Sequence, residues 1–571
     1  MEEHVWDLAP SDADRVQDLI DSADISRPTA LVLAARGITR DGVEAFLRPA
    51  LSHLVDPYAL PGARQAAERL WGAILKGDRI LIHGDYDTDG ITAAALMAWV
   101  LRQNGADVEC YLPHRIDDGY GLTAESIEKA CADHCRLLLT VDCGITSYDA
   151  IRAARDHGLD IIVTDHHMPG NEPLAAHTIV DPKLPGAPAT IQDLAGVGVA
   201  FKVCHAFVKY GRQNGFGGED TDLKQGLDLV ALGTVADIVP LLHENRLLVR
   251  HGLDVLARQQ RPGIHALCEI ANIRDELSTA DITYRLAPRL NATGRMGDPI
   301  DSLRLLESDS MVSAFNLARS LDEHNRQRQL IEEEVVQSAD AQIAALYDLS
   351  RNRAIVVWNE SWHQGVVGIV ASRLTRRYHR PSVVLTRDAN GQYTGSARSI
   401  RRVNLVEILE HCRGSLVRYG GHAMAAGLSL EPAMLPSFCQ EFESAVSQIL
   451  GVDAMRPLLD IAGEVQFDEL KGQFFEELSL LQPFGHSNPE PVFITRQVTP
   501  ERCSRIGADR LHTRGQLRDA SGVRLPFIAF GRTPEAMPEP PWDVVYTPQM
   551  NRYNGTEYPQ LRLLDVHRAE G

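Results

Sequence analysis

The sequence lacks several features that would each have pointed to a particular class of protein. Its nine cysteines are an odd number, they are scattered along 571 residues, and no Cys-x-x-Cys pair occurs. This excludes a zinc ribbon and a disulfide framework, so we expect reduced thiols in a cytoplasmic protein. No run of about 18 apolar residues exists, and we expect no membrane span. The acidic start, MEEHVWDLAPSDADRVQDLIDSADIS, has neither the basic region nor the apolar core of a secretion signal.

Basic residues are also scarce, with 57 lysines and arginines against 77 acids and a formal net charge of −20. Over the whole chain this balance disfavours a nucleic-acid partner. The average hides one reversal, because residues 373–418 hold ten arginines against three acids. Arginine binds two phosphate oxygens at once, so this stretch is a candidate phosphate-binding surface. A solvated face with ordinary arginine usage explains it equally well.

The length of the chain suggests three or four domains. Residues 1–75 predict a helical N-terminal region. Residues 76–305 alternate short apolar runs with helical segments, which predicts a parallel sheet with crossover helices. Residues 306–348 predict one long connecting helix, with an ordinary helix pair as the alternative. Residues 349–452 predict a second α/β domain, and the short β-rich runs of residues 453–571 predict a small β-barrel. The predicted fold class is therefore multidomain α/β.

Acidic and histidine side chains stand where the predicted strands end. Four motifs carry them: HGDYDTDG with His83, Asp85, Asp87 and Asp89; TVDCG with Asp142; TDHH with Asp165, His166 and His167; and the apolar helix GLDLVALGTVADIVP, which closes on Asp237. In an open α/β sheet, ligands bind beyond the carboxyl ends of the strands. We therefore expect these groups to converge, although they are far apart in the sequence.

Crowded aspartates repel one another unless a cation neutralises them. Carboxylates with imidazole and without thiolate suit hard or borderline divalent ions such as Mn²⁺ or Mg²⁺. One ion would take His83, Asp87 and Asp142, and a second would take Asp89, His166 and Asp237, with Asp142 as the bridge. Two ions roughly 3.5–4 Å apart can clamp a phosphoryl group and activate water. An Asp-Gly turn or a His-His pair alone is weak evidence, but the four motifs in order favour the metal site.

These motifs resemble the four phosphoesterase motifs of the DHH family. DGYGL, LAGVGVAFK, APRLNATGRMGD, GSARS and GGHAMAAG further resemble its single-stranded-DNA exonuclease branch. The resemblance implies a DHH catalytic domain, a DHH-associated domain and a C-terminal OB-fold. It implies an enzyme with two ions, Mn²⁺ favoured, that degrades single-stranded DNA 5′→3′ to 5′-mononucleotides in DNA repair and recombination. Single-strand-binding protein and a RecQ-type helicase would be its protein partners.

The resemblance also assigns roles to single residues. The six ligands named above carry over, Asp85 is a further catalytic candidate, and His167 polarises the scissile phosphate or donates a proton to the leaving oxygen. The groups expected to hold phosphates of the DNA are Arg115, Arg295, Ser396, Arg398, Gly421 and His422. Cys143 follows Asp142 where the family often has asparagine. We expect it to lie beside the metal site, with little effect beyond sensitivity to thiol reagents.

Two other functions compete with this interpretation. A related phosphodiesterase could act on short oligonucleotides, cyclic dinucleotides or pyrophosphate, but the barrel and the long helix favour a polymer. A non-catalytic replication factor with a relic site would have broken motifs, and here every ligand is present. Residues 501–571 hold ten arginines against nine acids. The barrel surface is thus not strongly basic, and both DNA binding and partner docking stay open for it.

Overall fold

The computed structural model describes residues 4–10, 12–114, 121–274, 277–450, 456–553 and 556–569. The chain folds into two compact units, which are described separately here. The larger unit comprises Val55–Asp237 and His251–Pro457, and the smaller comprises Met1–Leu54, Ile238–Arg250 and Leu458–Gly571. Among the described residues, none of the helices has the length and apolar character that a membrane crossing requires.

The first sheet of the larger unit is parallel throughout. Its strands, in spatial order, are β3 (Val108–Tyr111), β2 (Ile80–Gly84), β4 (Leu137–Val141), β5 (Asp160–Thr164) and β6 (Thr178–Val180). Every residue of β2 and β4 is buried. Strands covered on both faces have no solvent-facing side, which is why these runs are apolar without alternation. The predicted parallel sheet is confirmed.

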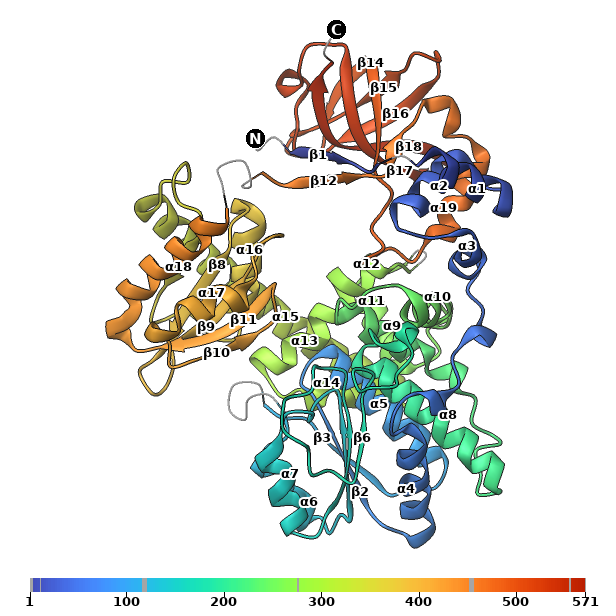
Figure 1. Ribbon diagram of the computed structural model, residues 1–571, viewed down its shortest axis with the longest axis vertical. Helices are drawn as coiled ribbons and strands as arrows, with labels where there is room; N and C mark the ends of the chain where they lie inside the picture. Colours follow the sequence, from blue (N-terminus) through green and yellow to red (C-terminus); the bar gives the residue numbers. More distant parts are fainter. Residues whose placement is uncertain are drawn as a thin grey trace. The chain divides into compact units, whose positions relative to one another are not determined.

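Helices cover both faces of this sheet (Figure 1). On one face, α6 (Ala124–Ala132) and α7 (Tyr148–Asp156) share a core with the strands. The helices α4 (Ala63–Lys76), α5 (Thr88–Gln103) and α8 (Gly196–Asn214) pack on the other. The fourth motif forms α9 (Leu227–Ala236), which packs against α5 and α8 and ends at Asp237 as its C-cap. The sheet edge where β2, β4 and β5 end therefore faces the starts of α5 and α8.

The predicted connecting helix is confirmed as α15 (Met311–Leu346), which is 36 residues long. Its N-terminal part packs against α11 (Pro262–Ile270), α13 (Ala287–Met296) and α14 (Ile300–Glu307). Val335, Val336, Ala339 and Ile343, in its C-terminal part, are buried in the core of the second α/β domain. One continuous helix therefore belongs to both domains of the larger unit.

The second sheet is mixed. Its strands, in spatial order, are β10 (Arg418–Gly421), β11 (Ala425–Leu430), β9 (Tyr393–Arg398), β8 (Ser382–Arg387) and β7 (Ile355–Trp358). Only β7 and β8 pair in parallel among these strands. Helices α15 and α16 (Val367–Tyr378) cover one face, and α17 (Leu405–His411) and α18 (Leu435–Ile449) cover the other.

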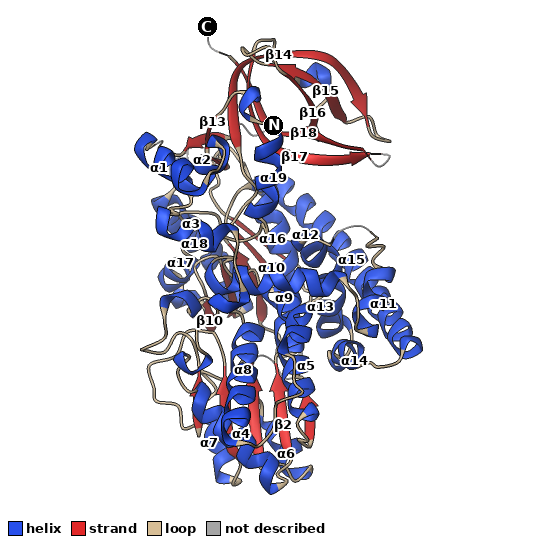
Figure 2. Cartoon of the chain, turned by 90° about the vertical axis from the view of Figure 1, so that its right-hand side faces the viewer, coloured by secondary structure: helices blue, strands red, loops and turns tan. Residues whose placement is uncertain are grey.

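The smaller unit contains the predicted barrel, which is confirmed. Its strands are β14 (Phe493–Ile506), β15 (His512–Arg518), β16 (Arg524–Ala529), β18 (Thr556–Arg568) and β17 (Trp542–Tyr553). Because β14 also pairs with β17, the sheet closes on itself (Figure 2). The short strand β13 (Gly463–Glu464) adds to β14 in parallel.

The N-terminal residues build part of this barrel unit. The expectation of helix is wrong for β1 (Val5–Leu8), which pairs in parallel with β12 (Leu458–Ile461). The following helices, α1 (Ala13–Ala23), α2 (Arg27–Ala35) and α3 (Arg40–Leu47), share a core with the barrel and α19 (Gly472–Leu481). The pairing of β1 joins residues more than 400 positions apart. A four-residue run carries no periodicity that could predict it.

Candidate metal centre and phosphate-binding groups

The segment that joins β2 to the first turn of α5 supplies the first two carboxylates, those of Asp87 and Asp89. Asp87 caps α5, and its Oδ1 accepts the backbone N–H of Asp89 at 2.9 Å and of Gly90 at 3.2 Å. The Asp89 carboxylate is held in turn by α8. Its Oδ2 accepts the N–H of Gly196 at 2.6 Å, and its Oδ1 accepts the N–H of Val197 at 2.9 Å. The positive end of a helix dipole therefore stabilises Asp89 in a buried position.

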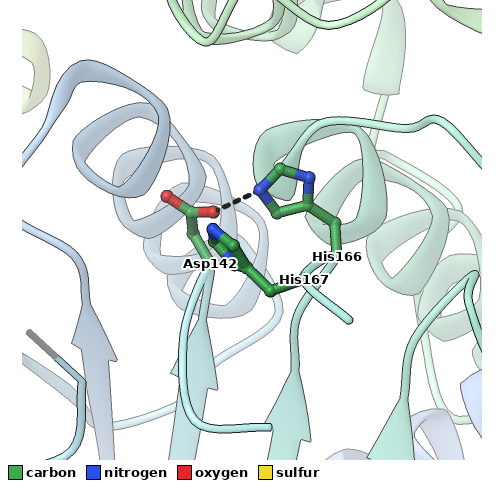
Figure 3. A group of neighbouring side chains, drawn as sticks. All are labelled: Asp142, His166 and His167. Carbon is green, nitrogen blue, oxygen red and sulfur yellow. Dashed lines mark ion pairs between the residues drawn. The ribbon is translucent and has the colours of Figure 1, made fainter. Parts of the chain in front are cut away.

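Asp142 and His166 meet at the ends of β4 and β5. Figure 3 shows their side chains pointing toward each other, with 3.1 Å between Asp142 Oδ1 and His166 Nε2. The same nitrogen lies 3.7 Å from Asp237 Oδ2 and 4.0 Å from Asp89 Oδ2. Four side chains from separate elements thus face one point. The backbone of Asp142 has a φ of 62°, which lets the chain turn sharply at the end of the strand.

Among the described residues there are three sets of possible ligands, and within each set the donor atoms lie within 4.8 Å of one another. The sets are Asp89 with His166 and Asp237, Asp85 with Asp87 and Asp142, and Asp142 with His166 and His167. The first set is the one that the sequence predicted for one ion. The second differs from the prediction for the other ion, because Asp85 stands where His83 was expected. Asp142 and His166 each belong to two sets, and they link the third set to the other two. The assignment of ligands stays a prediction.

The imidazole of His83 contacts a cysteine. Cys143 Sγ lies 3.5 Å from His83 Nδ1 and 3.9 Å from the His83 carbonyl oxygen. Cys143 therefore lies beside the centre, as expected, but it contacts a predicted ligand. The thiol is fully buried. Burial, with the charges of Asp165 and Asp85, raises the pKa of Cys143 well above that of an ordinary cysteine. A buried thiol with a raised pKa reacts poorly, which argues against the expected sensitivity to thiol reagents.

Burial of so many acids raises their pKa values. Burial and the charge of Asp87 raise the pKa of Asp89 to about 7, against the opposing N–H groups of α8. Burial, followed by the charges of neighbouring aspartates, also raises the pKa values of Asp142 and Asp237 well above the ordinary range. Burial lowers the pKa of His166 to about 3, so its imidazole is neutral at pH 7. Without a cation, protons have to neutralise this cluster.

These residues fit divalent ions. Asp142 Oδ1 and His166 Nε2 are buried, and neither has a hydrogen-bond partner among the described residues. Buried polar atoms without partners are rare in folded proteins, and a bound cation would satisfy both. Carboxylate oxygens with neutral imidazole are the donors expected for Mn²⁺ or Mg²⁺. Glycines provide the room, because a Cβ on Gly196 would lie 2.4 Å from Asp142 Oδ1, and one on Gly233 would lie 2.8 Å from Asp89 Oδ1.

Asp165 organises the turn after β5, a role that the sequence did not reveal. Its Oδ1 lies 2.7 Å from His167 Nδ1 and accepts the N–H groups of His166 and His167. Its Oδ2 accepts the N–H of Ile145 at 2.9 Å, which links the turns that follow β4 and β5. Burial lowers the pKa of His167, but the hydrogen bond and charge of Asp165 outweigh it and raise the pKa above the ordinary value. The sequence signal for the importance of Asp165 was its position as the first residue of the Asp165-His166-His167 motif.

The second sheet gathers groups of the opposite kind. Ser396 and Arg398 lie on β9, and a Cβ on Gly368 would be 3.2 Å from both Ser396 Oγ and Arg398 Nη2. The first turn of α16 therefore lies beside a hydroxyl and a guanidinium. Unpaired N–H groups at a helix start, together with arginine, are a common anion-binding arrangement.

Gly421 and His422 lie at the turn between β10 and β11. The N–H of His422 donates to Ala425 O at 2.8 Å, and Ala425 pairs with Arg398 across the sheet. Gly421 has a φ of 143°, and a Cβ there would lie 2.5 Å from Ala425 O, so only glycine fits. Arg295, on α13, donates from Nη1 to the carbonyl of Gly365, just before α16, at 2.8 Å. Arg115 lies outside the described residues.

The arginine-rich stretch is largely committed to contacts inside its own domain. Arg373 pairs with Glu332 and Glu333 of α15, and Arg377 pairs with Asp340 of the same helix. Buried Arg380 donates to backbone carbonyls, and Arg387 pairs with Glu360. In this structure these four arginines contact protein groups, and a phosphate-binding role for the stretch stays a prediction. Much of the local excess of charge holds α15 and the strands together.

Comparison with known proteins agrees with this geometry. The DHH family N-terminal domain matches residues 79–234, the DHHA1 domain matches residues 351–448, and the RecJ OB domain matches residues 461–565. The single-stranded-DNA-specific exonuclease RecJ of Bacillus subtilis is 34% identical over 571 residues, covering 99% of this chain and 71% of that protein. RecJ of Escherichia coli is 38% identical over 454 residues, covering 76% and 78%.

Solved structures give the same result. RecJ of Thermus thermophilus in complex with Mn²⁺ matches with a TM-score of 0.84 and 31% identity, covering 99% of this chain and 80% of that one. The same protein with Mg²⁺ matches with a TM-score of 0.79 and 29% identity, covering 99% and 79%. A parallel sheet whose strand ends carry this cluster of carboxylates and histidines, followed by a DHHA1 domain, defines a DHH phosphoesterase. The chain belongs to the RecJ family.

Proposed function

We propose that this protein is an exonuclease specific for single-stranded DNA, which it hydrolyses 5′→3′ to 5′-mononucleotides in DNA repair and recombination. One observation carries the proposal: buried carboxylates and a neutral histidine converge at the ends of β2, β4 and β5 and of α9. The RecJ proteins of Bacillus subtilis and Escherichia coli, which align with 99% and 76% of this chain, are single-stranded-DNA-specific exonucleases by name, which supports the substrate and the reaction. The barrel and the DHHA1 domain, which match along with the catalytic domain, favour a polymeric substrate over a small one.

We propose that the centre takes two ions, Mn²⁺ or Mg²⁺. Asp89, His166 and Asp237 would hold one, and Asp87 with His83 or Asp85 would hold the other, with Asp142 shared. When bound, such ions neutralise phosphoryl oxygens and lower the pKa of water. RecJ of Thermus thermophilus has been solved in complex with Mn²⁺ and with Mg²⁺, which supports the choice of metals.

His167 would transfer a proton at the scissile phosphate. Asp165 engages Nδ1, so proton transfer would use Nε2. The raised pKa of His167 keeps its imidazole protonated further into the neutral range, as a donor to a leaving oxygen or an oxyanion requires. Ser396, Arg398, Gly421 and His422 would bind phosphates further along the strand, with Arg115 and Arg295 as additional contacts. Binding should then weaken as salt rises.

We also propose that the protein acts in the cytoplasm with single-strand-binding protein and a RecQ-type helicase. The support for these partners is the family resemblance. The support for the compartment is that all nine cysteines are free thiols, as a reducing environment maintains them.

The test is degradation of a 60-nucleotide single strand labelled at either end, with Mn²⁺, by the native protein, Asp142→Ala and Asp142→Asn. We expect early release of the 5′ label as a mononucleotide and loss of this release in both variants. Equal activity in the variants would contradict the assignment of the centre. First release of the 3′ label would contradict the polarity. Cleavage of a 5-mer without cleavage of the 60-mer would favour the alternative phosphodiesterase that acts on short oligonucleotides or cyclic dinucleotides.

A further inference from the structure

A residue 203 positions further along the chain contacts the metal-binding segment between two of its predicted ligands, Asp87 and Asp89. Thr88 stands between Asp87 and Asp89, and it is 1% exposed. Its backbone N–H donates to Asn291 Oδ1 at 2.8 Å, and its hydroxyl donates to the same oxygen at 2.9 Å. Thr88 begins α5, where the first N–H groups have no partner within the helix. Asp87 caps two of these groups, and Asn291 caps a third.

Asn291 lies on α13, and this helix is itself firmly held. Arg289 binds Asp322 of α15 through Nε at 3.0 Å and Nη2 at 2.9 Å, and the Asp322 side chain is buried. On its other side α13 packs directly on the loop, since a Cβ on Gly294 would lie 2.9 Å from Tyr86 O. The helix therefore contacts the loop at Tyr86 and Thr88, on both sides of Asp87. A rigid element of this kind can fix the ligands more closely than the loop alone could.

We propose that Asn291 is a positioning residue, which holds Asp87 and Asp89 in the geometry that divalent ions require. The inference rests on the proposed function of this centre. The amide suits the position because its oxygen accepts two hydrogen bonds and adds no negative charge to the crowded carboxylates nearby. Asn291 acts through Thr88 and touches no reacting atom. The APRLNATGRMGD motif is thus tied to the metal centre through its asparagine, in addition to any contact of Arg295 with DNA.

The experiment measures Mn²⁺ binding to the full chain without DNA, by the loss of the electron paramagnetic resonance signal of free Mn²⁺. We expect Asn291→Ala to weaken Mn²⁺ binding by about tenfold, the scale of outer-shell partners of metal sites. Asn291→Asp keeps the accepting oxygen and adds a negative charge, so its affinity should equal or exceed that of the native protein. Asn316→Ala, an exposed asparagine on α15, is the matched control and should bind as the native protein does.

Thr88→Val separates the two hydrogen bonds, because it removes the hydroxyl donor and keeps the N–H. We expect an intermediate loss of affinity, and the double variant Thr88→Val with Asn291→Ala should bind Mn²⁺ about as weakly as Asn291→Ala alone, because that single change already removes both hydrogen bonds. A lower melting temperature for Asn291→Ala with unchanged Mn²⁺ affinity would overturn the inference, because Asn291 would then be only structural. Native protein that binds Mn²⁺ without degrading DNA would overturn the proposed function alone. Native protein that binds no Mn²⁺ would overturn both.

Discussion

The two α/β domains of the larger unit carry opposite chemistry on their sheets. In the first domain, β2, β4 and β5 each lead into an aspartate, and the acids that follow are almost completely buried. In the second, β9 carries Ser396 and Arg398 beside the first turn of α16. A cation completes the first arrangement and an anion completes the second. A phosphodiester chain in the presence of divalent ions offers both.

Burial is what separates the two arrangements energetically. A buried carboxylate keeps its charge only if something compensates it, so the pKa values of Asp89, Asp142 and Asp237 rise. Arg398 is only partly buried, and an arginine guanidinium is charged at any pH at which proteins fold. The first domain should therefore depend strongly on metal and pH, whereas the second should respond mainly to salt. Each prediction below tests one side of this difference.

The largest effect should come from closing the space around Asp142. In Gly196→Ala, the new Cβ would lie 2.4 Å from Asp142 Oδ1, while the N–H of residue 196 still has to reach Asp89. We expect Mn²⁺ affinity and nuclease activity to fall by about 100-fold, the upper scale of supporting residues at metal sites. Gly198→Ala is the control, because its Cβ would meet only the flexible Leu194 side chain, nearest at 3.1 Å. Native Mn²⁺ affinity in Gly196→Ala would show that Asp142 is not a ligand.

The sequence predicted the site best where acidic or histidine side chains follow the end of a strand or helix. The apolar runs and their terminal acids predicted the parallel sheet and the convergence of Asp89, His166 and Asp237, since strand ends of one sheet share an edge. It could not show that Asp85, and not His83, would form a set with Asp87 and Asp142. The grouping depends on side-chain direction at the end of β2 and in the loop that follows, and a string of alternating acids contains no such information.

Contacts made by backbone groups, and contacts between segments far apart in the sequence, also could not be predicted from the sequence. Gly196 matters because its N–H and its missing side chain both face carboxylates. The pairing of β1 with β12 depends on where two chain segments meet. The ion pairs of the arginines in residues 373–418 could not be predicted for a related reason. Their partners, such as Glu332 and Asp340, lie on α15, outside the window in which charges were counted.

A smaller effect is expected from Asp165→Asn, which keeps an accepting oxygen and removes the charge beside His167. The pKa of His167 should fall, because the hydrogen bond and charge of Asp165 raise it in the native protein. If His167 acts as a proton donor, the alkaline limb of the pH–rate profile should move to lower pH. Activity at pH 8 should fall by about 30-fold, part of the usual contribution of acid–base catalysis. An unshifted limb with unchanged Mn²⁺ affinity would remove His167 from proton transfer.

The second domain should respond differently, through binding of the strand. We expect Arg398→Ala to raise the KM for single-stranded DNA about tenfold with little change in kcat, as for the loss of one charge-assisted hydrogen bond. The salt dependence of binding should also become shallower. Arg377→Ala is the matched control, because Arg377 already pairs with Asp340. Equal effects of the two substitutions would mean that β9 provides no specific phosphate site.

The smallest effect is expected on stability. The dependence of the free energy of unfolding on pH and metal should reveal the buried charges of the first domain. Because the pKa of Asp89 is raised from 3.8 to about 7, the folded protein holds more protons than the unfolded chain between these values. Without metal, the free energy of unfolding should therefore decrease as pH rises through this window. Asp142 and Asp237 shift in the same direction. Mn²⁺ replaces the protons, so its stabilisation should be absent near pH 4 and grow toward pH 8.

Thermal unfolding followed by circular dichroism, with Mn²⁺ or with EDTA, would measure this dependence. We expect the melting temperatures to coincide near pH 5 and to differ by about 5 °C at pH 8 when Mn²⁺ is far above its Kd. Asp89→Asn should narrow the gap at pH 8, because one buried charge is gone, whereas Arg398→Ala should leave it unchanged. A gap of equal size at every pH would mean that Mn²⁺ does not displace protons from these aspartates. The metal would then bind elsewhere, and the contrast between the two sheets would not rest on buried charge.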